Sequence, residues 1–179
     1  MIDRHARVLA SAGLAVGAVL GLAGTFAPSA SLRGLLWGID GIALIMAGAL
    51  LAVAFVRSGE DVLAAGFIVF AIGEALVVST STMDLTAATP IFGAGMAGWA
   101  MALALISAPR RFPLPVRALG GLAAVLFAVS ALRVFAGAPL TALTVPLPFG
   151  AYPFLVATMF GWIWTLWRGR AEPFQQGPA

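Results

Sequence analysis

The chain has 179 residues, of which 61% are hydrophobic and only 9% are charged. A soluble domain carries about 25% charged residues because its surface must stay hydrated, so this composition excludes a soluble globular domain. The 10 basic residues are all arginine and outnumber the 7 acidic residues. Most of them lie at the ends of apolar stretches, which is typical of a membrane protein and not of a nucleic-acid-binding surface.

Six apolar stretches follow one another along the chain, separated by short polar or proline-containing segments. They cover residues 8–27, 34–56, 62–80, 91–108, 116–136 and 149–167. Each is about 20 residues long, which is the length of a helix that crosses the hydrocarbon core of a bilayer. None alternates in the manner of a barrel strand, and backbone groups cannot stay unpaired in lipid. We therefore predict an all-α fold: a single domain over residues 1–179 that forms a polytopic bundle of six transmembrane helices.

Two segments allow more than one interpretation. The first apolar stretch is longer than the apolar region of a signal peptide, and Pro28 stands where a cleavage site needs a small residue. We therefore expect this stretch to remain as a helix. The connection over residues 137–148 is uncharged and largely apolar. We expect it to cap the bundle at the membrane interface, while the alternative is a re-entrant segment that lines a cavity.

The distribution of arginine predicts the orientation of the chain. With the N-terminus in the cytoplasm, eight arginines fall on the inner side and only Arg33 and Arg133 fall toward the outer side. The inner ones are Arg4, Arg7, Arg57, Arg110, Arg111, Arg117, Arg168 and Arg170. The positive-inside rule therefore places both termini in the cytoplasm. The plan resembles that of small bacterial membrane proteins, and we expect the chain in the cell membrane, specifically a bacterial inner membrane.

Three ionisable residues lie inside the predicted spans: Asp40, Glu74 and Arg133. At a rise of 1.5 Å per residue, Asp40 and Glu74 lie about 9 Å below the outer boundary, and Arg133 lies about 5 Å below it. Such residues normally face the bundle interior or a wet cavity. They are candidate residues for binding or transporting a polar solute or a proton. In the structural alternative, Arg133 pairs with Glu74 or extends outward, and Asp40 benefits from the dipole at the start of its helix.

Small residues recur along the first helix. Gly13, Gly17 and Gly21 are spaced four residues apart and form a smooth strip, which lets another helix approach closely. We expect this strip to pack inside the bundle; the alternative is a homo-oligomer that forms through the first helix. Trp99, in the fourth apolar stretch, is interpreted as a core residue.

Several kinds of chemistry are excluded by residues that the chain lacks. It contains no cysteine and no lysine, and its only histidine is His5, outside every predicted span. Iron–sulfur clusters, bis-histidine haem, a typical zinc site and a Schiff base are therefore excluded. No phosphate-binding loop, dinucleotide-binding motif or nucleophile elbow is present. We expect no metal, no cofactor, no nucleic-acid partner and no enzymatic activity.

The resulting hypothesis is a non-enzymatic membrane protein, either a bundle that binds a small polar ligand or a lipid, or a scaffold. The alternative is a small-solute or proton-coupled transporter or channel that uses a buried layer of Asp40, Glu74 and Arg133. A wet path to both membrane faces would favour transport, and a blind site would favour binding.

Overall fold

In a computed structural model, residues 3–81, 83, 85–138 and 146–168 are described, and they form six α-helices. In chain order these are α1 (Arg4–Thr25), α2 (Ala30–Arg57), α3 (Asp61–Ser79), α4 (Leu85–Ser107), α5 (Leu114–Phe135) and α6 (Pro146–Arg168). The prediction of an all-helical bundle is therefore confirmed.

Local signals explain where several of these helices begin and end. The Asp3 carboxylate accepts a hydrogen bond from the backbone N–H of His5 at 3.1 Å and so caps the start of α1. The Ser29 hydroxyl accepts one from the N–H of Leu32 at 3.2 Å and caps α2. After α2 the chain turns at Gly59, whose φ of 73° lies in the left-handed region that favours glycine.

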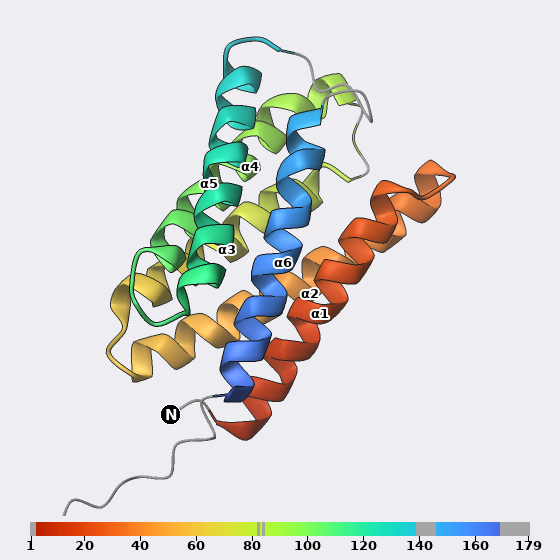
Figure 1. The fold of residues 1–179 in the computed structure, drawn as a ribbon. Coiled ribbons are helices and arrows are strands. Elements are labelled where there is room, and N and C mark those ends of the chain that lie inside the picture. The colour runs from red at the N-terminus through yellow and green to blue at the C-terminus, as the bar shows by residue number, and fades with distance from the viewer. Residues whose placement is uncertain (1–2, 82, 84, 139–145, 169–179) are drawn as a thin grey trace, which may run out of the picture.

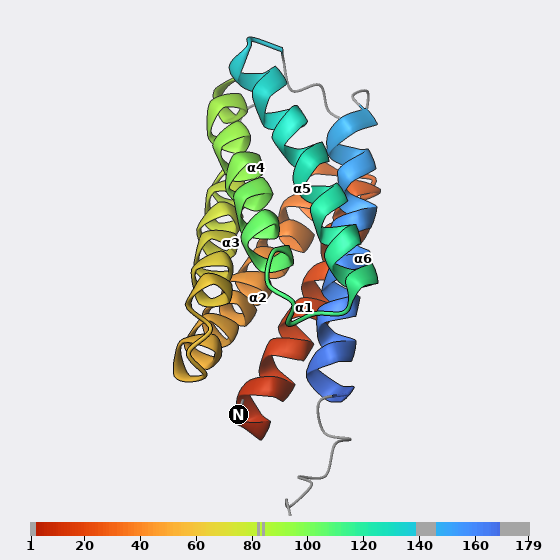
Figure 2. The ribbon, with the colours of Figure 1, turned by 60° about the vertical axis from the view of Figure 1, so that its left-hand side comes forward.

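The six helices form a closed ring. Each helix packs against the next one in the chain, and α6 packs against α1, which is the least extensive of these contacts. Figures 1 and 2 show that the start of α1 and the end of α6 lie at the same end of the bundle, here called the terminal side. The opposite end, with the α1–α2, α3–α4 and α5–α6 connections, is called the distal side. There the α1–α2 hairpin leans away from the other four helices (Figure 1).

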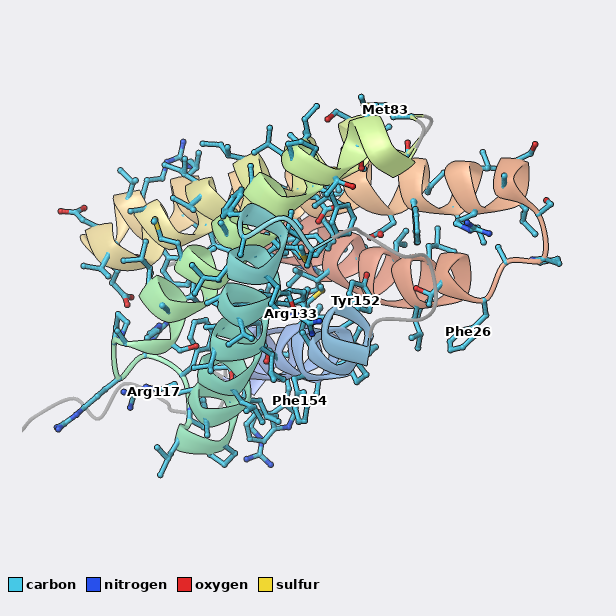
Figure 3. The ribbon with its side chains drawn as sticks, turned by 90° about the horizontal axis from the view of Figure 1, so that it is seen from above. Phe26, Met83, Arg117, Arg133, Tyr152 and Phe154 are labelled. Carbon is cyan, nitrogen blue, oxygen red and sulfur yellow. The ribbon has the colours of Figure 1, made fainter. Side chains whose placement is uncertain are left out.

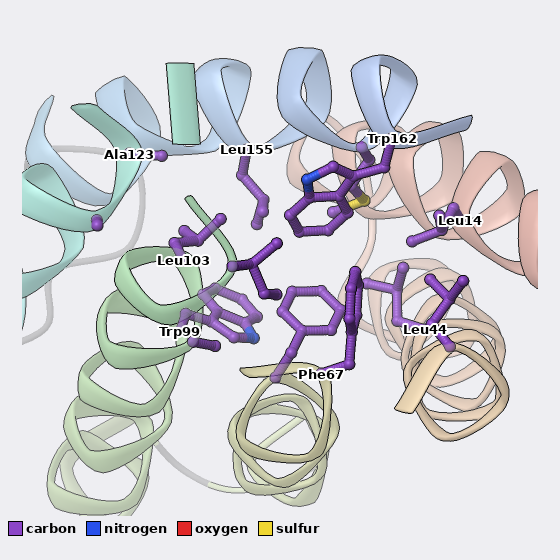
Figure 4. Packing of buried hydrophobic residues seen from close by; sticks show 14 of the residues in the cluster. Leu14, Leu44, Phe67, Trp99, Leu103, Ala123, Leu155 and Trp162 are labelled. Carbon is purple, nitrogen blue, oxygen red and sulfur yellow. The ribbon is translucent and has the colours of Figure 1, made fainter. Parts of the chain in front are cut away.

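A cluster of aromatic side chains fills the interior toward the terminal side. This aromatic cluster consists of Phe55, Phe67, Phe70, Phe112 and Trp162, all of them buried. The Trp162 ring packs edge-on against Phe67, with ring centroids 5.1 Å apart, and against Phe70 at 6.0 Å. Figure 4 shows Trp162 of α6 and Phe67 of α3 facing each other across the centre of the ring. Edge-to-face packing of this kind makes a dense apolar interior.

The outer surface of the bundle is as apolar as its interior. Large apolar side chains are exposed on every helix, among them Ile42 at 70% and Leu132 at 66%. A soluble monomer rarely exposes continuous apolar surface of this kind, whereas lipid solvates it readily. By length and composition, five helical segments can cross a membrane: Arg4–Thr25, Ala30–Arg57, Asp61–Ser79, Ala87–Ser107 and Leu114–Phe135. These apolar helices and the apolar outer surface indicate a membrane protein.

Every helix begins earlier than the apolar stretch that predicted it, by four residues or more in α1, α2 and α4. We expected α4 to start after Pro90, but it begins at Leu85 and includes that proline. Pro90 falls in the second turn, where its missing N–H removes one backbone hydrogen bond near the start of the helix. We expected α2 to start at Gly34, but the Ser29 cap begins it at Ala30. Most of the segment over residues 137–148 for which we expected an interfacial cap, namely residues 139–145, lies outside the described residues.

Candidate functional site

Asp40 and Glu74 are brought together in the interior of the bundle. Asp40 lies on α2 and is 5% exposed, and Glu74 lies on the neighbouring α3 and is 2% exposed. Gly41 follows Asp40 directly in the chain. A Cβ on Gly41 would lie 3.2 Å from the carboxyl oxygen Oε1 of Glu74. The two carboxyl groups thus lie at the same level of the bundle on neighbouring helices. We define them as the carboxyl pair.

Glycines on two helices make room for this pair. A Cβ at Gly17 of α1 would lie 3.1 Å from Oδ1 of Asp40, and one at Gly21 would lie 2.6 Å from Oδ2. On α2, a Cβ at Gly41 would overlap with the side chain of Val78 on α3. Only residues without a side chain let α1, α2 and α3 approach closely enough to enclose both carboxyl groups.

Two further side chains complete the site, and neither was predicted from the sequence as a site residue. Tyr152 of α6 places its hydroxyl against Gly21, on the same side as Oδ2 of Asp40. Trp99 of α4 packs against Tyr152, with ring centroids 6.4 Å apart. Its indole N–H lies near the Glu74 carboxyl, but the geometry falls short of a hydrogen bond. Trp99 is thus a core residue, as expected, and it also borders the site.

One signal for Tyr152 was available in the sequence. It is the only tyrosine in the chain and interrupts an apolar helix with a hydroxyl group. A buried tyrosine hydroxyl usually has a polar neighbour. That neighbour lies on α1 and α2, more than 100 residues away in the chain, so the sequence alone could not identify it.

The ionisable groups buried at the site are acidic and have no basic partner among the buried residues described. The buried polar or charged residues of the described chain are Ser11, Asp40, Glu74, Thr80, Ser130 and Thr158, and none of them is basic. Three buried atoms have no hydrogen-bond partner among the described residues: Oδ1 of Asp40, Oε2 of Glu74 and Nε1 of Trp99. Leaving a buried polar atom without a hydrogen-bond partner costs about 1–3 kcal/mol. A ligand that pairs with these atoms would remove that cost, so the site favours binding one. The species that two carboxyl groups satisfy is a cation or a proton.

Arg133 does not join the carboxyl pair. Its side chain is exposed, and the ion pairs of the described residues are His5–Asp3 and Arg111–Glu60. The expected pairing of Arg133 with Glu74 is therefore absent from the described part of the chain. The physical reason is that Arg133 lies on the exposed face of α5, while α4 packs between α3 and α5. Figure 3, viewed from the distal side, labels Arg133 on α5 and Tyr152 on α6.

The glycine strip of α1 faces α2 within the same chain. A Cβ at Gly13 would lie 2.6 Å from the backbone oxygen of Ala43, and one at Gly17 would overlap with the Leu44 side chain. Gly13, Gly17 and Gly21 are all buried. The strip is thus occupied inside the bundle, and it offers no free surface to a second copy of the chain.

The geometry defines a class of protein: a helical membrane protein with a pair of carboxyl groups enclosed by five of its helices. Comparison with known protein families, with curated proteins and with solved structures finds no match.

Proposed function

We propose that the chain is a non-enzymatic membrane protein that binds a cation, the proton included, at the carboxyl pair. The single observation that carries this proposal is the meeting of two buried carboxyl groups with no basic side chain among the buried residues described. Two ionised carboxylates in an apolar interior repel each other and lose their hydration, and both penalties disappear when a positive charge binds. Ionisable groups inside a membrane are expensive and commonly mark a binding or transport site.

Binding is favoured over transport by the position of the aromatic cluster. Phe70 lies one turn from Glu74 toward the terminal side, and Phe67 lies two turns from it. Transport across the membrane would require a polar route through these rings. The alternative, a proton-coupled or small-solute transporter, therefore needs a second conformation in which the cluster separates.

For the orientation we propose six membrane crossings, with the terminal side in the cytoplasm and the chain in the cell membrane of a bacterium. This proposal rests on the arginines of the terminal side, which are Arg4, Arg7, Arg57, Arg110, Arg111, Arg117 and Arg168. On the distal side lie Arg33 and Arg133. The asymmetry follows the positive-inside rule.

Cysteine labelling tests this orientation directly, because the chain has no cysteine of its own. Single cysteines at Gly59 and Arg111 should be protected from impermeant thiol reagents in intact cells. Single cysteines at Ala27 and Ala136 should be labelled. The reverse pattern would contradict the proposed orientation, and labelling of both pairs from one side would contradict the number of crossings.

Cation binding is tested by the stability of the purified protein in detergent. The unfolding temperature of the wild type should rise with proton or cation concentration, because a ligand that binds only the folded state stabilises it. The variant Asp40→Asn with Glu74→Gln should lose this dependence. Glu60→Gln, which changes a carboxylate outside the site, is the matched control and should keep it. An identical dependence in wild type and the double variant would contradict the proposal.

A further inference from the structure

We infer that the cation is a single proton, shared by Asp40 and Glu74 and exchanged with the distal side past the hydroxyl of Tyr152. This inference rests on the proposed cation binding and names its ligand and its route.

The close packing around the carboxyl pair favours a ligand that occupies almost no space. Even a methyl group would overlap with neighbours at three positions that border the pair: with Leu44 at Gly17, with Tyr152 at Gly21 and with Val78 at Gly41. An organic ammonium ion is far larger than a methyl group. A proton needs no additional space, because it is held within an O–H bond between oxygens that are already present.

The ligands around the pair are also too few for a metal ion. Calcium takes six to eight oxygen ligands, and magnesium needs about six in an octahedral arrangement. The groups that can be placed near the pair include the Tyr152 hydroxyl, the Trp99 indole N–H and the apolar side chains of Leu44 and Val78. Of these, only the hydroxyl can ligate a metal. The described residues contain no group of three or more His, Cys, Asp or Glu side chains that could hold one.

An organic cation would also need a free aromatic face. The Trp99 ring is already packed edge-on against Phe127, with centroids 5.1 Å apart, and against Tyr152. The Trp37 ring covers Gly24 and lies beneath the guanidinium of Arg33, 6.0 Å from its centroid. Both rings are therefore already in contact with other side chains of the chain.

The surroundings of the pair differ between the terminal side and the distal side. Toward the terminal side, Trp162 packs against Phe67 and Phe70. None of these three rings carries a group that can both accept and donate a proton, so the aromatic cluster cannot relay one. Toward the distal side the α1–α2 hairpin leans away from α6 (Figure 1). Tyr152 stands at this divergence.

A tyrosine hydroxyl at this position can pass a proton without changing its own state. It donates its proton to a carboxylate oxygen of Asp40 and accepts one from a hydronium ion on its distal side. One O–H bond forms and one breaks at the tyrosine, and no electron is transferred. The net result moves one proton from water to the carboxyl pair.

The other helices around the pair add one titratable group, the hydroxyl of Tyr152 on α6. α1 contributes Gly17 and Gly21, α4 contributes Trp99, and α6 contributes Tyr152. α5 packs against α4 and α6, and its Phe127 ring contacts Trp99. The proton balance of the site therefore involves Asp40, Glu74 and, as a relay, Tyr152.

Infrared spectroscopy of the protein in lipid nanodiscs tests the inference, because a protonated carboxyl group absorbs separately from a carboxylate. The wild type near neutral pH should show an acid carbonyl band that shifts in D2O. The variant Asp40→Asn with Glu74→Gln should lose this band, and Glu60→Gln should retain it. In Tyr152→Phe the band should persist while its hydrogen–deuterium exchange slows by about a hundredfold, a typical loss for a positioned proton-transfer group. Ser130→Ala, which removes a buried hydroxyl elsewhere, should exchange like the wild type.

The outcomes separate this inference from the proposed function. If no acid band appears but sodium, potassium or tetramethylammonium chloride stabilises the wild type and not the double variant, the ligand is a cation other than a proton and the inference is wrong. If neither the band nor any such stabilisation appears, the proposed function fails as well. If the band is present but Tyr152→Phe exchanges like Ser130→Ala, the route past Tyr152 is wrong.

Discussion

Substituting Gly13 with alanine tests how closely α1 and α2 approach. A Cβ at this position would lie 2.6 Å from the backbone oxygen of Ala43 and 3.0 Å from Cβ of Ala47. Ordinary contact begins at 3.4 Å, so the two helices would have to separate by several tenths of an ångström. A backbone oxygen inside a helix cannot rotate away, so the strain should fall on the helix pair.

The magnitude follows from two opposing effects. Overpacking of a close interface costs about 1–3 kcal/mol, while replacing glycine by alanine inside a helix gains up to about 1 kcal/mol. The matched control is Gly121→Ala on α5, where the added Cβ has no neighbour within 4 Å. The control gains the same helix propensity without the clash. Gly13→Ala should therefore be less stable than Gly121→Ala by about 1–3 kcal/mol, the overpacking effect alone.

Reversible unfolding in mixed detergent micelles provides the measurement. Gly17→Ala adds an informative intermediate, because its Cβ would meet the side chains of Leu44 and, at 3.1 Å, Asp40 (Oδ1), which can shift, instead of backbone. Its free energy of unfolding should lie between those of the other two variants. Equal stability of Gly13→Ala and Gly121→Ala would refute the close approach of α1 and α2 at this position.

Three further predictions concern other contacts, each measured as a change in the free energy of unfolding. Trp162→Ala removes the ring at the centre of the aromatic cluster and should cost about 3–5 kcal/mol; a loss below that of an exposed Trp164→Ala variant would be inconsistent with its burial. Arg117→Gln removes hydrogen bonds of 2.7 and 2.9 Å to two carbonyls at the end of α4 and should cost about 1.5–3 kcal/mol, with Arg117→Lys intermediate because lysine lacks the forked donor. Arg111→Ala breaks a partly exposed ion pair with Glu60 at 3.4 Å and should cost less than about 1 kcal/mol, a loss that high salt in the wild type should reproduce.

The helices and the burial of the carboxyl groups could be predicted from the sequence because both depend on local features. An apolar stretch of about 20 residues forms a helix in lipid wherever it occurs in the chain. A carboxylate in such a stretch is expensive to expose to hydrocarbon, so it turns inward, as Asp40 and Glu74 do. The helix starts at Leu85 and Ala30 were missed because apolarity marks the membrane-embedded part of a helix and not its polar first turns.

The partners of each buried group could not be predicted, because they depend on the order of helices around the ring. Arg133 lies at a depth similar to that of Glu74, but depth says nothing about rotation around the helix axis. In α5 the buried residues include Phe127 and Ala131, and Arg133 falls on the opposite face at about 100° per residue. Because α5 is apolar all round, its sequence gives no indication of that face. The same limit explains why Tyr152 was not connected with Asp40.

The difference in length between α2 and α3 makes the carboxyl pair sensitive to the thickness of the bilayer. α2 has 28 residues and α3 has 19, so the two helices are about 42 and 28 Å long. A hydrocarbon core of about 30 Å accommodates α3 nearly upright, whereas α2 must tilt or protrude, and hydrophobic mismatch determines by how much. Asp40 is carried by the helix that adjusts and Glu74 by the helix that does not. A change in lipid chain length would therefore move one carboxyl group relative to the other.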